Sequence, residues 1–259
     1  MKAAILLLAI IAAQTAPTPA PEEGARWQVD WGQQMCSLVR TRPGATPIDF
    51  AIQIVPGSGS ADLILGRRDD TERSRIASPV VIALAPNDMR FETEMVFTRG
   101  SYTTFRGLKP DFLNRFAAAR EIQVLQNGGI RASIPVPSTE GVIAAVGQCL
   151  DSVQAQWGID AARLATLRQW PELDRPWVHA DDYPTSALRA NVSGQTILRL
   201  TIDAEGRITG CTTIATSGNE ALDRASCANV SQGRFRPALD QNGAPIAVEI
   251  AMPIRWTVH

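Results

Sequence analysis

The residues that could take part in the widest range of chemistry in this chain are its cysteines, because a thiol can bind a metal, act as a nucleophile or form a disulfide. Within the 259 residues they are Cys36, Cys149, Cys211 and Cys227. A zinc site is disfavoured, since no Cys-x-x-Cys spacing occurs and the only histidines are His179 and His259. The sequence predicts no metal site and no cofactor. In an oxidising compartment these thiols are expected to form disulfides.

The N-terminal segment indicates such a compartment. Lys2 supplies a positive charge, residues 3–13 (AAILLLAIIAA) form an apolar run, and small residues and prolines follow up to Pro21. This is the layout of a secretory signal peptide, predicted here over residues 1–20. A membrane-spanning helix needs about 20 apolar residues, so cleavage is favoured over an uncleaved anchor. The mature protein is therefore expected to be soluble and exported.

Four cysteines allow three disulfide pairings. Cys36 and Cys149 bracket the first long region, whereas Cys211 and Cys227 lie close together in the last. The pairing Cys36–Cys149 with Cys211–Cys227 is favoured because it keeps each bridge inside one domain. By the loop-closure model such bridges contribute about 3–5 kcal/mol each, with the longer loop contributing more.

Groupings typical of enzymes are missing from the sequence. No Ser–His–Asp arrangement is credible, because one histidine falls in a predicted linker and the other is the last residue. Asp181 and Asp182 are interpreted as solvated charge. The stretch Gly57-Ser58-Gly59 is too short for a phosphate-binding loop, is not followed by lysine, and is predicted to be a turn. We therefore predict that the protein is not an enzyme.

Composition and charge limit which classes of protein remain possible. The chain is 45% apolar and 20% charged, which is typical of a globular protein. Its 25 basic and 26 acidic residues give a net charge of −1, without the basic excess that a nucleic-acid-binding protein usually has. At about 100–200 residues per domain, the length predicts two domains.

Residues 27–157 are predicted to form a β-rich exported domain of unknown function. Asn127-Gly128-Gly129 is a hairpin signal. Helices are predicted over residues 110–119 and 138–154, the second capped by Ser138. Residues 158–180 are predicted to be a short helix, 160–169, followed by a proline-containing linker. Strands are predicted over residues 27–31, 35–39, 48–54, 61–65, 80–84, 91–97, 122–125 and 130–134.

Residues 181–259 are predicted to form a small two-layer domain of class α+β. A short helix follows Tyr183-Pro184, and strands are expected over 198–202, 208–215 and 246–256. A second helix is expected after an Asn219 cap, with Leu222, Ala225 and Asn229 on one face. The economical arrangement is a three-stranded antiparallel sheet covered by helices on one face.

An ordered series of motifs in this last region is similar to the TonB C-terminal domain family. It begins with Tyr183-Pro184 and the Asp203-x-x-Gly206-Arg207 hairpin, and it closes with Gly243-x-Pro245-Ile246 and Pro253-Ile254. The family-motif residues are Tyr183, Pro184, Gly206, Ser217, Gly218, Leu222, Asp223, Phe235, Pro237 and Ala238. The resemblance covers about the last third of the chain.

The resemblance implies a non-enzymatic binding module in the periplasm of Gram-negative bacteria. Such domains capture peptide segments of outer-membrane transporters by strand addition, in energy-dependent transport across the outer membrane. Other envelope proteins are alternative partners. The final strand is the best candidate edge, and Pro253 suits an edge because it has no N–H to donate. The candidate partner-binding residues are Ile246, Val248, Glu249, Ile250, Ala251 and Met252.

The chain also departs from a complete energy transducer. The apolar run is short, and a cysteine-containing region stands where such a transducer has a long proline-rich spacer. One alternative is a membrane-anchored transducer with an uncleaved N-terminus, facing the periplasm and contacting inner-membrane motor proteins. Another is an envelope structural or interaction protein with no transport role. A homodimer formed by exchange of C-terminal strands is a further expectation.

Overall fold

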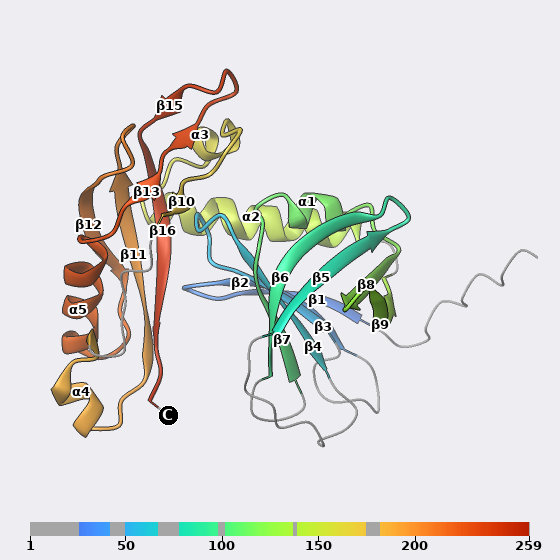
Figure 1. Ribbon diagram of the computed structural model, residues 1–259, viewed down its shortest axis with the longest axis horizontal. Coiled ribbons are helices and arrows are strands. Elements are labelled where there is room, and N and C mark those ends of the chain that lie inside the picture. Colours follow the sequence, from blue (N-terminus) through green and yellow to red (C-terminus); the bar gives the residue numbers. More distant parts are fainter. Residues whose placement is uncertain are drawn as a thin grey trace, which may run out of the picture.

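The computed structural model describes residues 26–41, 50–66, 78–97, 102–136, 139–174 and 182–258. The predicted signal peptide, Ser138, His179, Asp181 and His259 lie outside these ranges. Within them the chain has the predicted α+β class, with a β-rich N-terminal part and a smaller C-terminal sheet covered by helices (Figure 1).

The N-terminal part is an antiparallel half-barrel. Its described residues form a nine-stranded sheet in the order β1-β2-β3-β4-β7-β6-β5-β8-β9. Every neighbouring pair in that order is antiparallel. The strands are β1 (Arg26–Trp31), β2 (Cys36–Thr41), β3 (Phe50–Ile54), β4 (Ala61–Gly66), β5 (Ser78–Ala85), β6 (Met89–Phe97), β7 (Tyr102–Leu108), β8 (Glu121–Gln126) and β9 (Gly129–Pro135).

The strand pattern confirms most of the predicted strands and adds one. The β8–β9 hairpin turns at Asn127 and Gly128, whose φ angles of 51° and 79° are those of the two-residue turn that joins twisted strands most easily. Strand β7 was not predicted. Its Thr103, Thr104 and Phe105 are buried in succession and Gly107 has a φ of 67°, so the period-two alternation that marks a half-buried strand is missing.

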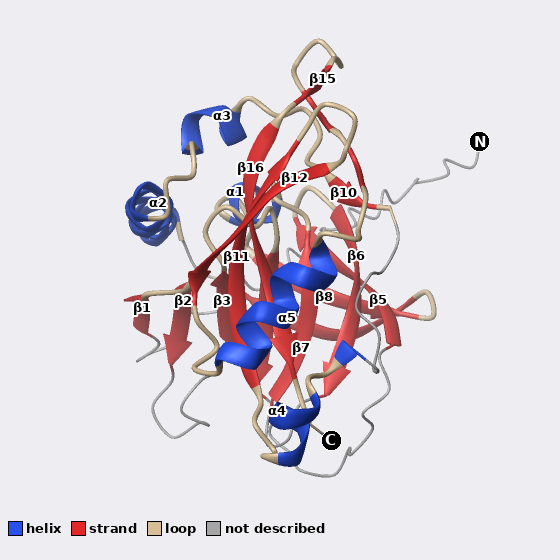
Figure 2. Cartoon of the chain, turned by 90° about the vertical axis from the view of Figure 1, so that its left-hand side faces the viewer, coloured by secondary structure: helices blue, strands red, loops and turns tan. Residues whose placement is uncertain are grey.

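Two helices pack on the half-barrel. Helix α1 (Phe112–Phe116) is shorter than the predicted 110–119. Helix α2 (Glu140–Gln156) buries Val146, Cys149 and Val153 at helical spacing, as predicted, but its N-cap residue is Thr139. Cys149 forms the predicted disulfide with Cys36 of β2. Figure 2 shows α2 end-on beside the sheet.

The C-terminal part is a three-stranded antiparallel sheet in the order β12-β11-β16, with helix α5 lying across it (Figure 2). Asn219 caps α5 by accepting hydrogen bonds from the N–H groups of Ala221 and Leu222, as predicted. The elements are α4 (Thr185–Arg189), β11 (Gly194–Ile202), β12 (Ile208–Ala215), α5 (Glu220–Val230), β13 (Phe235–Arg236), β14 (Ala238–Leu239), β15 (Pro245–Ile246) and β16 (Val248–Trp256).

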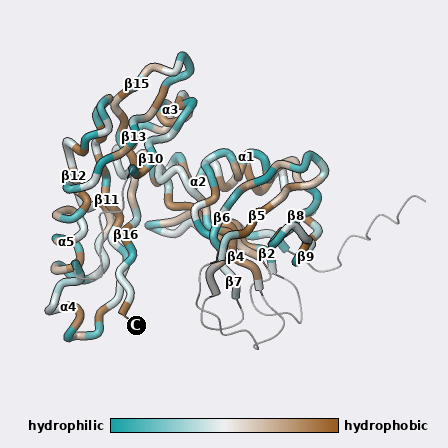
Figure 3. The backbone as a smooth tube through the Cα atoms, viewed as in Figure 1, coloured by the Kyte–Doolittle hydropathy of each residue, from teal (hydrophilic) through white to brown (hydrophobic). Residues whose placement is uncertain are grey.

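The buried face of α5 includes the predicted residues and extends beyond them. Leu222, Ser226 and Val230 are buried, at a spacing of four residues, and hydrophobic and hydrophilic residues alternate around the helix (Figure 3). The predicted residues border this buried line, since Leu222 is part of it, Ala225 packs against the C-terminal cluster and Asn229 is partly buried. The fully buried positions also include Ser226 and Val230, which the prediction did not name. The predicted second disulfide, Cys211–Cys227, joins β12 to α5.

The segment between the two sheets is folded against both. Helix α3 (Ala161–Ala165) is capped by Asp160 and ends earlier than predicted, since Gln169 leaves the helical path to form a bridge with Leu239. Strand β10 (Glu172–Leu173) then pairs with β13. The described start of the predicted linker is therefore attached to the C-terminal part, because two of its residues complete a strand ladder.

Buried apolar residues form two clusters. One fills the half-barrel beneath α1 and includes Phe50, Phe112 and Phe116. The other runs from the disulfide pair and the end of α2 into the C-terminal sheet. The sheet is therefore covered by α4 and α5 on one side and contacted from the half-barrel on the other.

Candidate partner-binding edge

Strand β16 lies at the border of the C-terminal sheet. It pairs with β11 from Val248↔Ile202 to Trp256↔Gly194, and no strand of the described chain pairs with its other side. In Figure 1 this other side faces the half-barrel. Five of the predicted edge residues lie on β16, namely Val248, Glu249, Ile250, Ala251 and Met252.

Ile246 is not part of the edge strand. It belongs to β15 and pairs with Ala238 of β14. The predicted strand over 246–256 is therefore two strands that meet at Ala247, because the turn at Asn242-Gly243 first folds the chain back onto β14. The predicted row of apolar residues at every second position is confirmed from Val248 onward. Val248, Ile250, Ile254 and Trp256 are all buried.

The direction in which each N–H and C=O group of β16 points determines which of them a bound peptide, here called a guest strand, could pair with. Neighbouring residues of an antiparallel strand direct their N–H and C=O groups to opposite sides. The Ala251 N–H donates to the Gly57 carbonyl at 2.9 Å, so Ala251 faces away from β11. By the same alternation Glu249, Pro253 and Arg255 also face outward. These four residues are here called the β16 rim.

The rim is already partly covered by the protein itself. Gly57 covers Ala251 of the rim, and Arg163 Nε donates at 3.0 Å to the carbonyl of Ala247, which immediately precedes β16. Ala251 is fully buried, although it lies on the strand face opposite the apolar row. Sequence reasoning missed both covering residues. The stretch Gly57-Ser58-Gly59 was predicted to be a turn, but nothing in the sequence indicates what that turn contacts.

Trp256 fastens the end of β16 to the helical layer. Its Nε1–H donates to Ser226 Oγ at 2.9 Å, and its ring meets the Tyr183 ring edge-to-face at 5.2 Å. The Tyr183 hydroxyl donates to the Val192 carbonyl at 2.6 Å. The motif residue Tyr183 therefore has a structural role beside the edge, and Pro184 precedes α4 as its N-cap residue.

The Ser217–Asp223 motif explains how α5 is tied to the sheet. The Asp223 carboxylate accepts hydrogen bonds from Thr196 Oγ1 of β11 at 2.7 Å, from the Ser217 N–H at 2.8 Å and from Thr216 Oγ1. Partial burial raises the pKa of Asp223, but these hydrogen bonds outweigh it and hold the pKa below its ordinary value of 3.8. Gly218 turns the chain here with a φ of 85°, and Leu222 is fully buried.

Replacing Asp223 should therefore weaken the fold and change its pH dependence. We expect Asp223→Asn to lower the free energy of unfolding at pH 7 by about 1.5–3 kcal/mol, since several hydrogen bonds lose their charged acceptor. The native pKa lies below the unfolded one, so this stabilisation is complete above the unfolded pKa and disappears as the pH falls through the native value. Urea unfolding from pH 7 to pH 3 should show a shallower loss of stability for the variant.

The matched control is Glu220→Gln in the same helical turn, because Glu220 is exposed and pairs only with Arg224 among its described contacts. We expect this change to cost less than about 0.5 kcal/mol. Equal losses for the two variants at pH 7 would contradict the role given to Asp223.

The remaining motif residues form the far end of the sheet. Gly206 has a φ of 77°, and a Cβ at this position would lie 1.9 Å from the Phe235 carbonyl oxygen, so only glycine fits. The Phe235 N–H donates to the Gly206 carbonyl at 2.9 Å. Pro237 separates β13 from β14, and Ala238 is fully buried.

Comparison with known proteins agrees with this arrangement. Residues 180–258 match the family model described as "Gram-negative bacterial TonB protein C-terminal". These residues form a TonB C-terminal domain. The chain is 32% identical over 77 residues to Protein TonB of Xanthomonas campestris pv. campestris (strain B100), and 31% identical over 77 residues to Protein TonB of Vibrio cholerae serotype O1. The aligned part is 30% of this chain and 34% and 31% of those relatives, so the chain spans about a third of their length.

The TonB C-terminal domain is a non-enzymatic family. The two disulfides together with this domain indicate the cell envelope. Among the described residues no group of three or more metal-ligating side chains comes together. Within the described ranges, no helix combines the length and apolar character needed to cross a membrane.

Proposed function

We propose that this chain is an exported, periplasmic TonB-like binding module that engages outer-membrane transporters by adding an extended segment of the transporter to β16. In this proposal the module takes part in energy-dependent transport, the signal peptide is cleaved, and the chain has no enzymatic activity. In it the half-barrel and the TonB domain are two domains joined by residues 158–180.

One observation carries the proposal. In a TonB C-terminal domain, β16 is a border strand whose far side meets no other strand of the described chain. A border strand offers unpaired N–H and C=O groups that an extended peptide can satisfy, and side-chain pockets then select the sequence. Pro253 on the rim fits a strand that is not in the middle of a sheet.

A proline substitution on the rim tests the proposal. The Glu249 N–H faces outward, so Glu249→Pro should spare the β11 ladder but remove a donor that a guest strand needs. We expect it to weaken binding of labelled decapeptides from the N-terminal segments of outer-membrane transporters by about tenfold or more, measured by fluorescence anisotropy.

Glu249→Ala is the matched control, since it removes the carboxylate and its hydrogen bond from Thr201 Oγ1 but keeps the backbone N–H. Its affinity should stay within about threefold of the unmodified protein. If no transporter peptide binds saturably to the unmodified protein or to any of its variants, the proposed function is wrong. If both variants bind as tightly as the unmodified protein, the binding edge is not β16.

A further inference from the structure

The turn between β3 and β4 is buried at its tip. Val55–Ser58 form a β-turn in which the Ser58 N–H donates to the Val55 carbonyl at 3.0 Å. Pro56 and Gly57 occupy its two central positions, and the φ of 76° at Gly57 is the value that a type II turn requires. Both central residues are buried, whereas turn tips usually lie in solvent. Another surface of the protein must therefore cover the tip of this turn.

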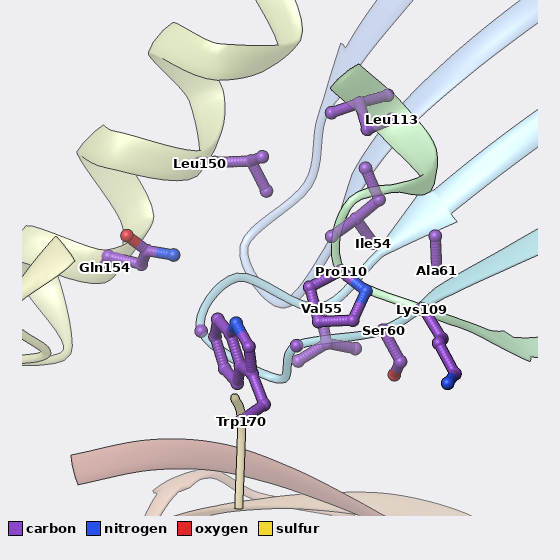
Figure 4. A pocket seen from close by; sticks show the side chains of 12 residues that line it. Ile54, Val55, Ser60, Ala61, Lys109, Pro110, Leu113, Leu150, Gln154 and Trp170 are labelled. Atoms are coloured by element: carbon purple, nitrogen blue, oxygen red, sulfur yellow. The ribbon is translucent and has the colours of Figure 1, made fainter. Parts of the chain in front are cut away.

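The partner surface is the β16 rim together with the segment after α2. The Gly57 carbonyl accepts the Ala251 N–H, and a Cβ at Gly57 would lie 3.0 Å from Ile159 Cδ1. A Cβ at Gly59 would lie 2.2 Å from the Trp170 ring, so this ring rests directly on the turn. Figure 4 shows the Trp170 side chain beside Val55. The turn is therefore held against the rim from two sides.

The contact uses the groups that a guest strand needs most. Of the four rim residues, Pro253 has no N–H and Ala251 already donates its own to Gly57. Only Glu249 and Arg255 keep an N–H without a protein acceptor among the described residues. Because Ala251 lies at the centre of the rim, a guest strand cannot run along β16 while the turn is seated.

The contact is also small enough to be reversible. One backbone hydrogen bond joins the turn directly to the rim, and the turn also contacts Ile159, the Trp170 ring and, through Val55, the C-terminal apolar cluster. The same turn lines a cavity of about 120 Å³ that is also bounded by Leu113, Leu150 and Trp170, so its inner side is not fully packed (Figure 4).

We propose that the β3–β4 turn, Val55–Ser60, is an intramolecular cap on the β16 rim, and that an extended peptide binds only when it displaces this cap. The inference rests on the proposed function and adds to it a regulatory role for the half-barrel. When only a fraction of molecules has the cap displaced, the apparent dissociation constant is the intrinsic one divided by that fraction. Loosening the cap should therefore tighten peptide binding.

Two substitutions in the full chain loosen the cap in different ways. Gly57→Val cannot keep a positive φ without strain, and Trp170→Ala removes the ring that rests on Gly59. The control is Gly128→Val, because Gly128 has a φ of 79° but nothing within 4 Å of its added Cβ, and it lies in the β8–β9 turn. It carries the same kind of backbone strain without touching the cap.

Two measurements are made on each protein. Hydrogen exchange of the Ala251 amide, followed by NMR after ¹⁵N-alanine labelling, reports the cap directly. Anisotropy titration with the transporter decapeptides measures their affinity for the β16 edge. We expect the Ala251 amide to exchange at least about tenfold faster, and the peptides to bind about tenfold tighter, in both cap variants but not in Gly128→Val.

The outcomes separate the cap from the proposed function. Unchanged Ala251 exchange in both cap variants overturns the cap. Faster exchange with unchanged peptide affinity overturns the inference, because peptide binding then does not depend on displacement of the cap; the Glu249 variants still decide separately whether β16 is the binding edge. Absence of binding to every variant, including those with fast exchange, overturns the proposed function and with it the inference.

Discussion

Removing the Cys36–Cys149 disulfide should lower the free energy of unfolding by about 4–5 kcal/mol, the largest single effect that we expect in this protein. The bridge closes a loop with a sequence separation of 113, so its loss frees a long stretch of the unfolded chain. Both cysteines are fully buried, and they belong to the apolar cluster that continues into the TonB domain. The experiment compares urea unfolding of the Cys36→Ala/Cys149→Ala double variant with that of the unmodified protein, followed by tryptophan fluorescence.

The second disulfide supplies an internal comparison. Cys211–Cys227 spans a separation of only 16, so the Cys211→Ala/Cys227→Ala variant should lose about 3 kcal/mol. Each double variant removes two sulfur atoms, so the two variants differ mainly in the length of the loop that the bridge closes. The order of the two losses in unfolding free energy is therefore a sharper prediction than either value. A larger loss from the short bridge would show that native packing, and not loop closure, determines what these disulfides contribute.

Trp256→Ala should be the most damaging single substitution on β16, with a loss of about 3–5 kcal/mol. The indole is buried between the sheet and α5, meets the Tyr183 ring, and donates its N–H to Ser226. Truncation leaves a cavity at the point where strand and helix are joined. Equilibrium unfolding in urea measures the loss, and near-ultraviolet circular dichroism reports whether the native packing survives.

Trp256→Phe separates the two contributions of this side chain. It keeps an aromatic ring near Tyr183 but removes the donor to Ser226, whose hydroxyl still donates to the Leu222 carbonyl at 2.8 Å. Its cost should therefore be about 1–2 kcal/mol. A loss from Trp256→Ala no larger than that from Trp256→Phe would assign the effect to the hydrogen bond alone.

Local patterns predicted the C-terminal domain well because its elements are strongly periodic and clearly bounded. Asn219 caps α5 and the apolar row from Val248 to Trp256 faces the helices, since both features depend on neighbours within a few residues. The same holds for the β8–β9 hairpin, where the turn residues themselves require the backbone geometry. Strand β7 escaped prediction because it is buried without alternation.

The sequence by itself determined the α+β class, both disulfide pairings, the TonB resemblance and the edge position of β16. Only the tertiary structure decided that this edge is partly covered. Gly57 and Ala251 are almost two hundred positions apart, and a backbone carbonyl that accepts a hydrogen bond leaves no mark on residue type. Contacts between backbones depend on how whole elements pack, and that packing places the tip of a half-barrel turn against the strand expected to bind a partner.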